Sequence, residues 1–466
     1  MKFYGILLNI KFVFLHIIKY TSNLNTMKKL ILIFLLFSTF LVTSQEHYSG
    51  ISTSNRVGIL NSTVNPAELP NLSKKFEVNI YGMSFNVANN KIGFSDFSSD
   101  TDFETLLFTG TEPVNARINT EILGPGFAMK WNKWGFAFIT KAYASFDMVD
   151  IDPTIGNAIT NDNLVLNTTL INNQSNQKLS GTSYGEIGLS AGRTILDKDN
   201  HKFSVGVTLK ILFPGSYSNF GLSKLDGTIT QSAGNAYLTT NSPASLNIAY
   251  SGNLAESFTN FDDYSKSIFG GLNGFSGDIG MNYQYKSIFN LGLSLRNLGS
   301  MTFKDDNNYS TNYVFTTQGN SPLDLSLFNN IDNLSDVEQI LIDGGYLSKN
   351  PEKKDFSVKL PTTINAYADV KVISKLHVTA FLQQKTNKDE ANEQITAPNI
   401  FSITPRINLG FFEGYIPVTF HEISGTNVGI GFRLGGFYLG TSSMITALIN
   451  DNKQGDLYFG FRWGFL

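Results

Sequence analysis

The chain has 466 residues, of which 16% are charged and 13% aromatic, with 38 Phe, 41 Gly and no Cys. Charged residues make up about 25% of an ordinary soluble domain, and a helical membrane protein carries repeated apolar runs of about 20 residues, which this sequence lacks. The absence of Cys excludes disulfides, thiolate zinc sites, a Cys nucleophile and lipidation of an N-terminal Cys. Residues 1–44 hold five Lys and no acid, and without them 30 basic and 38 acidic residues leave a net charge of −8. This balance argues against nucleic acid as a partner, because nucleic-acid binding requires a basic face.

The N-terminus carries an export pattern. Met27-Lys28-Lys29 precedes a thirteen-residue stretch, Leu30 to Val42, that is apolar at all but two positions and is followed by Thr43-Ser44-Gln45. A basic start, a short apolar core and a small-residue exit are typical of a secretory signal. As a helix the stretch would span only about 20 Å, which is short of a bilayer core of about 30 Å. We therefore predict that residues 1–44 are a signal peptide, with Met27 as an alternative start.

From Phe76 onward apolar residues recur with a period of two, which is typical of strands with two different faces. The last segment is the clearest, with Leu457, Phe459, Phe461, Trp463 and Phe465 on one face and Tyr458, Gly460, Arg462 and Gly464 on the other. The same alternation occurs at Phe203–Ile211, Phe289–Arg296 and Val428–Leu434. Gly, Ser and scattered Arg or Lys on the polar face suit a wet lumen, and Phe with Trp and Tyr near strand ends suits lipid. These features favour a transmembrane barrel over a soluble sandwich.

The connections between these strands alternate in length. Short turns are predicted at 131–133, 196–200, 285–287, 373–375, 412–414 and 435–436. Longer polar links are predicted at about 87–117, 148–181, 213–271, 304–355, 386–397, 422–425 and 447–455. Six short and seven other connections join about fourteen antiparallel strands, with both chain ends on one side, as in outer-membrane barrels. The predicted fold class is therefore all-β, an outer-membrane barrel over residues 76–466, with Phe461, Trp463 and Phe465 as the insertion signal read by the assembly machinery.

One helix is predicted inside the long link 304–355. Ser335-Asp336-Val337-Glu338 matches a capping box, and the helix that it opens is expected to end at Gly344-Gly345. The helix either packs the loop or forms a lid over the pore.

Asn65-Pro66-Ala67, just before the first strand, resembles an element of the long-chain fatty-acid transporter family (FadL/TodX-like). In that family the element lies in an N-terminal hatch that plugs a fourteen-stranded barrel. The resemblance implies that residues 45–75 form a short plug, with Asn65, Pro66 and Ala67 as plug or gate residues. Val205–Lys210 and Leu293–Gly299 also resemble strands of that superfamily, whose PorV branch in Bacteroidota serves the type IX secretion system as a shuttle.

Taken end to end, the sequence is most similar to an outer-membrane family of Bacteroidota that is a domain of unknown function. The resemblance implies a channel or transporter for small hydrophobic molecules, or a plugged barrel that acts as a protein-binding adaptor. An apolar, roomy cavity would favour transport, and a lumen packed solid would favour the adaptor. The links 213–271 and 304–355 are long enough to bind a protein partner. The expected partners are thus the lipid bilayer, the assembly machinery, and either a small hydrophobic ligand or a protein.

Catalysis, metal binding and cofactor binding find little support. The four His of the mature chain, His47, His201, His377 and His421, form no ligand-spaced cluster. Gly181-Thr182-Ser183-Tyr184-Gly185 matches the letters of a nucleophile elbow, but the sequence continues as an alternating strand rather than a helix. We expect Ser183 to be a strand residue, and we expect no cofactor.

Charged residues predicted to face the lumen are the remaining candidates. By parity, six basic residues point inward, Lys210, Arg296, Lys371, Arg406, Arg433 and Arg462, against four acids, Glu77, Glu186, Asp278 and Asp369. A guanidinium can bind a carboxylate in a bidentate pair, so Arg296, Arg406, Arg433 and Arg462 are candidates to bind an organic acid. The alternative is a ladder of ion pairs that fills the barrel.

Overall fold

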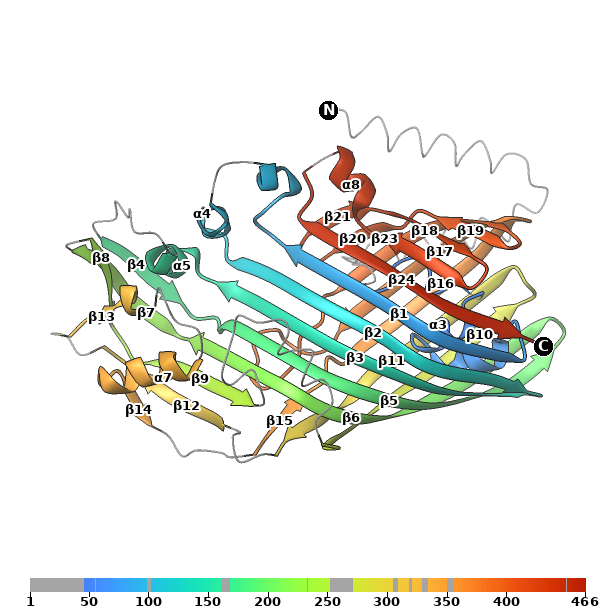
Figure 1. Ribbon diagram of the computed structural model, residues 1–466, viewed down its shortest axis with the longest axis horizontal. Coiled ribbons are helices and arrows are strands. Elements are labelled where there is room, and N and C mark those ends of the chain that lie inside the picture. The colour runs from blue at the N-terminus through green and yellow to red at the C-terminus, as the bar shows by residue number, and fades with distance from the viewer. Residues whose placement is uncertain are drawn as a thin grey trace. The chain divides into compact units, whose positions relative to one another are not determined.

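The computed structural model describes residues 46–54, 56–98, 102–160, 168–232, 234–251, 271–304, 309–317, 321–328, 334–349, 355–449 and 451–466. The predicted signal peptide lies outside these residues. Most of the described chain is strand, arranged as a closed barrel with a folded lobe at one end (Figure 1). No described helix is long and apolar enough to cross a membrane.

Fourteen wall strands follow one another around the barrel, each antiparallel to the next. They are β1 (Phe76–Asn89), β2 (Val114–Trp131), β3 (Trp134–Ile151), β5 (Gln177–Lys198), β6 (His201–Ser223), β10 (Gly274–Tyr285), β11 (Phe289–Phe303), β16 (Thr363–Ile373), β17 (Leu376–Lys385), β18 (Ile400–Leu409), β19 (Phe412–Tyr415) continued by β20 (Val418–His421), β21 (Gly425–Val428) continued by β22 (Ile430–Leu434), β23 (Phe437–Thr441) and β24 (Gln454–Phe465). The last strand, β24, pairs with β1 from Phe76↔Phe465 to Ala88↔Gln454 and closes the ring. The predicted closed barrel of about fourteen strands is confirmed.

Short turns join the wall strands at one end, as predicted, but one of them lies elsewhere than expected. The turn predicted at 412–414 is made by Gly410 and Phe411, because Phe412 to Tyr415 pair with Leu409 to Arg406. Gly410 has a φ of +80°, a conformation that glycine adopts without steric cost, and this places the turn two residues earlier.

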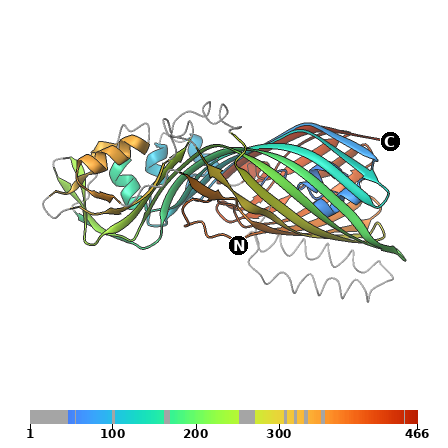
Figure 2. The same ribbon diagram turned by 90° about the horizontal axis from the view of Figure 1, so that it is seen from below.

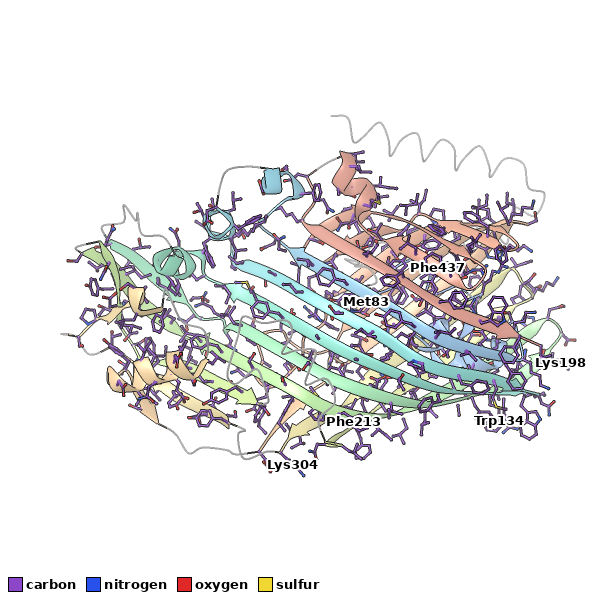
Figure 3. The ribbon with its side chains drawn as sticks, viewed as in Figure 1. Met83, Trp134, Lys198, Phe213, Lys304 and Phe437 are labelled. Carbon is purple, nitrogen blue, oxygen red and sulfur yellow. The ribbon has the colours of Figure 1, made fainter. Side chains whose placement is uncertain are left out.

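The apolar face of the wall points outward and the polar face points into the lumen. Val207 and Trp463 are each 54% exposed, whereas their strand neighbours Lys210 and Arg462 are buried at 2% and 6%. A soluble sandwich would bury its apolar face instead. The predicted facing is therefore confirmed on both strands. Figure 3 places Trp134 and Lys198 together at the short-turn end.

Three long links contribute to a folded outer lobe, defined here by the described residues 153–160, 168–173, 225–232, 234–251, 309–317, 321–328 and 334–349. Its elements are α5 (Pro153–Thr160), β4 (Thr168–Asn173), β7 (Leu225–Ser232), β8 (Asn235–Thr240), β9 (Ala244–Ser251), β12 (Tyr309–Phe315), β13 (Leu323–Asp324), η4 (Leu325–Phe328), α7 (Leu334–Asp343) and β14 (Leu347–Lys349). The strands β13, β8, β7 and β4 form a separate four-stranded sheet, while β9 pairs with the far end of β6 and with β12. The lobe lies at the left of Figures 1 and 2.

The outer lobe has its own hydrophobic core, which includes Leu225, Ile229, Leu238 and Leu246. The wall strands β5 and β6 reach it because they are 22 and 23 residues long, about twice the 9–11 residues that cross a bilayer. The long links therefore contain strands that were not predicted, because the alternation at Leu225 to Ser232 serves a second core rather than the barrel wall.

Helix α7 confirms the predicted helix end and corrects its start. The helix begins at Leu334, which is buried, so Ser335 lies in the first turn and is not the N-cap of the expected capping box. It ends before Gly344 and Gly345, and Gly345 has a φ of +72°. The Glu338 carboxylate accepts hydrogen bonds from the hydroxyls of Tyr309 (2.7 Å), Tyr250 (3.4 Å) and Tyr313. The helix therefore packs the lobe rather than covering the pore. Burial, reinforced by the hydrogen bond to Glu338, raises the pKa of Tyr313 well above its ordinary value.

The remaining elements are β15 (Phe356–Lys359), which pairs with the far end of β11, and five short helices. Two of these, α3 (Gly58–Ser62) and η1 (Pro66–Asn71), precede the first wall strand. Two more, η2 (Phe94–Ser98) and α4 (Phe103–Leu107), lie in the β1–β2 link, and α8 (Met444–Ile449) lies between β23 and β24.

Candidate functional site

Residues 46–54 and 56–75, called the plug segment below, lie inside the ring of wall strands, where α3 and η1 are seen in blue in Figure 2. The backbone of η1 rests directly on wall glycines. A Cβ added to Gly135 would lie 2.3 Å from Leu69, and one added to Gly206 would lie 2.4 Å from Pro66. The wall therefore needs glycine at these positions to accommodate the segment.

The Asn65-Pro66-Ala67 element begins η1 and anchors it to the wall. The Asn65 side-chain oxygen accepts a hydrogen bond from the Ala67 backbone N–H (3.0 Å), and Pro66 occupies the first helical position, where its missing N–H costs nothing. The Asn65 amide donates to the Met281 carbonyl (2.9 Å) and to the Tyr367 hydroxyl (3.3 Å). All three residues of the element are buried, so it fastens the plug segment to β10 and β16.

Glu68 makes three hydrogen bonds from the plug segment to the wall, and sequence reasoning missed it. Its carboxylate accepts hydrogen bonds from the amides of Asn282 (2.8 Å) and Asn290 (2.9 Å) and from the Tyr367 hydroxyl. A carboxylate directly after Asn-Pro-Ala, in a segment that has to be buried if it plugs a barrel, is the signal that could have found it.

Apolar contacts between the plug segment and the wall fill the half of the lumen at the short-turn end. Ile51, Val57, Ile59, Leu60 and Leu69 of the plug segment pack against Leu123, Tyr415, Tyr438 and Tyr458 of the wall. The Tyr458 hydroxyl also donates to the Ser49 carbonyl (2.5 Å). This half of the lumen is thus filled by a mixed apolar and hydrogen-bonded core.

Buried ion pairs occupy much of the lumen wall. Arg462 donates to Glu77 (3.0 Å), Arg406 to Asp369 (2.6 Å) and Arg433 to Glu413 (3.3 Å). Lys210 lies 3.0 Å from Asp278 and 3.7 Å from Glu186. Three of the four candidate arginines therefore already hold an acid, as in the paired ladder considered as the alternative. Glu413 was missed because it was placed in a turn.

A second group of charges, from β2 and β3, lies where no inward residue was assigned, because the alternation there is weak. Arg117 contacts both Glu46 of the plug segment (2.5 Å) and Asp147 (2.6 Å), and Lys141 contacts Glu121 (2.9 Å). Arg117 thereby links the plug segment to the wall.

The lumen is closed again at the outer mouth by the link between β17 and β18, residues 386–399, called the mouth loop below. Lys178 of β5 donates to the Ala391 carbonyl (3.1 Å), Asn176 to the Glu390 carbonyl (2.6 Å) and Arg117 to the Thr396 hydroxyl (2.8 Å). Ile395 of the loop packs with Tyr217, Phe303 and Phe356 in an apolar cluster.

A cavity of about 100 Å³ lies between the plug segment and the mouth loop. Glu46, His47 and Val64 line it from one side and Ile395 and Ala397 from the other. The wall contributes mostly polar and charged side chains, among them Arg117, Glu121, Lys141, Tyr143, Tyr184 and Arg296. Its volume is below the 300–1,000 Å³ of an ordinary ligand pocket and its lining is mostly polar, so it is not the roomy, apolar cavity that would favour transport.

Arg296 differs from the other three candidate arginines. It lines the cavity, whereas a buried nitrogen without a hydrogen-bond partner is common to all four arginines. Within the described ranges it makes no ion pair with an acid. The structure therefore leaves Arg296 able to bind a further acceptor within the cavity.

The described residues include no group of three or more His, Asp or Glu side chains that could hold a metal ion. Ser183 lies within β5, as predicted, where its hydroxyl accepts a hydrogen bond from the Ser216 backbone N–H (3.1 Å).

The sequence pattern of a family of unknown function (DUF5723) matches residues 66–442. The chain belongs to this family. The match begins at Pro66 of the plug segment and ends at Ser442, just before α8. Membership in a family of unknown function was expected and is confirmed. A comparison with curated proteins gives no match.

Three solved structures illustrate what this chain is similar to. They are the toluene transporter TbuX of Ralstonia pickettii (11% identity, 88% of this chain and 95% of that chain, TM-score 0.40), the toluene transporter TodX of P. putida (9%, 86% and 92%, 0.40) and a FadL homologue of Pseudomonas aeruginosa (8%, 89% and 94%, 0.40). Likeness at this level of identity and TM-score carries no argument about function.

Proposed function

We propose that this protein is an outer-membrane β-barrel that acts as a gated channel for small hydrophobic molecules bearing a carboxylate. The membrane location is supported by the outward apolar face and by the placement of the three Trp. Trp131, Trp134 and Trp463 are all exposed on strand ends at the short-turn side, as in an interfacial aromatic girdle.

The observation that carries the channel proposal is the cavity held between two separate closures. Neither closure is a wall strand, since one is the plug segment and the other is the mouth loop. Both could therefore move while the hydrogen-bonded ring of strands stays closed. In this proposal, the small, mostly polar cavity corresponds to the state in which both closures are shut.

Arg296, rather than Arg406, Arg433 or Arg462, contacts the ligand in this proposal. Its guanidinium would hold the carboxylate, while Phe381 and Ile395 line the cavity with apolar surface for the remainder of the molecule. Glu121 also lines the cavity, so a dianion would be repelled more strongly than a monocarboxylate. Neutral hydrocarbons would leave the arginine without an acceptor.

Replacing Arg296 by Gln should weaken binding of a short-chain monocarboxylate such as hexanoate by about 1.5–3 kcal/mol, the usual contribution of a charged hydrogen bond. Titration calorimetry on the purified protein in detergent measures this. Arg193→Gln is the matched control, because Arg193 lies over the ring of Trp134 on the outside of the wall. Equal hexanoate affinity in the native protein and in Arg296→Gln would contradict the assignment.

A second candidate function, a protein-binding adaptor, is favoured by the outer lobe. A lobe with its own hydrophobic core is more than a channel needs to connect its strands. An adaptor would lose a bound partner when residues 309–349 are replaced by a short linker, and flux through the barrel would not change.

A further inference from the structure

Helix α8 exposes apolar side chains and buries a polar one, which is the reverse of a helix in water. Met444, Leu448 and Ile449 are 51%, 75% and 77% exposed, whereas Thr446 is buried. The Thr446 hydroxyl accepts a hydrogen bond from the Val428 backbone N–H (2.6 Å), so the polar side chain faces the protein. A surface helix normally buries its apolar stripe and exposes its polar face. A contiguous exposed apolar patch of this kind marks a surface that contacts something other than water.

The wall beneath α8 is unusually short. The strand that leads into it, β23, has five residues and spans about 17 Å at about 3.3 Å per residue. The apolar band of a membrane barrel is about 25 Å tall, so β23 alone does not reach across it. Figure 1 shows α8 at the outer edge of the barrel, beside the start of β24. The helix thus lies where a longer β23 would continue the wall.

The apolar face of α8 continues the outward face of the neighbouring strand. Leu457 and Phe461 point outward on β24, and residues 437–450 contain no charged side chain. The charged residues nearest in sequence, Asp451 and Lys453, are turned toward the β1–β2 link. Asp451 accepts from the Ser95 hydroxyl (2.9 Å), and the Lys453 amino group donates to the Asn90 carbonyl (2.8 Å). These contacts hold the end of α8 in place at the rim.

We propose that α8 lies in the interface of the bilayer, with Met444, Leu448 and Ile449 seated among lipid. This inference rests on the proposed membrane location and deepens it. On the β23 side the helix supplies the upper part of the lipid contact that strands supply elsewhere. Continuity with the lipid-facing strands favours lipid over a protein partner as the occupant of this face.

The chain has no Cys, so single cysteines can be introduced and spin-labelled without background. Three variants are compared in phosphatidylcholine vesicles, Leu448→Cys on α8, Leu457→Cys on the lipid-facing wall and Asp343→Cys on the exposed end of α7. The measurement is the accessibility of each label to oxygen, which concentrates in lipid, relative to a water-soluble nickel chelate. Ile449→Cys serves as a second α8 variant if Leu448→Cys folds poorly.

The oxygen-to-nickel ratio at position 448 should be close to that at 457 and several-fold higher than that at 343. A ratio at 448 equal to that at 343, with 457 still in lipid, would overturn the proposal and leave the membrane location intact. That result would also be expected if a protein partner absent from the vesicles covers α8. An aqueous ratio at 457 itself would overturn both the α8 proposal and the membrane location.

Discussion

Replacing Glu77 by Ala is expected to lower the free energy of unfolding by about 3–5 kcal/mol, the range measured when one partner of a buried ion pair is removed. Glu77 is fully buried and accepts both from Arg462 (3.0 Å) and from the Ile59 backbone N–H at the start of α3 (2.9 Å). Its loss would leave the buried Arg462 without an acid and α3 without a hydrogen-bond acceptor. The substitution therefore weakens two contacts, the one between β24 and β1 where the barrel closes and the one that attaches the plug segment to the wall.

Urea unfolding of the detergent-solubilised protein measures this loss, and three further variants define its origin. Glu77→Gln keeps a hydrogen-bond acceptor and should lower the free energy of unfolding by less than Glu77→Ala. Glu77→Ala combined with Arg462→Met removes both charges and should be more stable than Glu77→Ala alone. Glu112→Ala, on the exposed β1–β2 link, should stay within about 0.5 kcal/mol of the native protein. A Glu77→Ala protein as stable as Glu112→Ala would show that the pair contributes nothing.

Phe461→Arg is the second large effect, because Phe461 points outward near the middle of β24. An arginine on the lipid face of a barrel costs about 2–4 kcal/mol at the midplane of the bilayer and about 0–1 kcal/mol near the interface. The folded, membrane-inserted fraction of Phe461→Arg should fall accordingly. Heat-dependent mobility on gels, after refolding into vesicles, reports this fraction.

The matched control is Phe465→Arg, four residues further along the same outward face and at the end of the strand. It should fold into vesicles nearly as well as the native protein. In cells, where Phe461, Trp463 and Phe465 are predicted to form the insertion signal, both variants should assemble poorly. Equal refolding of the two variants in vesicles would contradict the position of the lipid band along β24.

The barrel wall could be predicted well from the sequence because the physical cause of its pattern is local. A strand between lipid and a wet lumen must alternate, so the residues from Leu457 to Phe465 indicate by themselves both the strand and its facing. The turns were predictable for the same reason, except where Gly410 shifted one of them by two residues. The ion pairs of Arg117 and Lys141 were missed because the strands β2 and β3 alternate weakly.

The outer lobe and the partners of the lumen arginines depend on contacts between distant segments. Leu225 and Ile229 alternate like wall residues, and nothing local shows that they pack into a second core with Tyr313 and Leu341. Parity alone put Arg296 and Arg406 on the same face. Only the fold shows that Asp369 reaches Arg406, whereas Asp278, the acid close to Arg296, is held by Lys210. Glu413 was missed because the turn was placed two residues too late, so that a wall residue was counted as part of the turn.

The gated-channel proposal is tested most directly by the conductance of single barrels in a planar bilayer, with and without residues 45–75. The intact protein should stay closed except for brief openings that become more frequent with hexanoate. The deletion variant should open more often and for longer than the intact protein, because the mouth loop is then the remaining closure. It should keep the gel mobility of a folded barrel, because the hydrogen bonds of the wall do not depend on the plug segment. An intact protein that conducts continuously, or a folded deletion variant that opens no more often than the intact protein, would contradict the account.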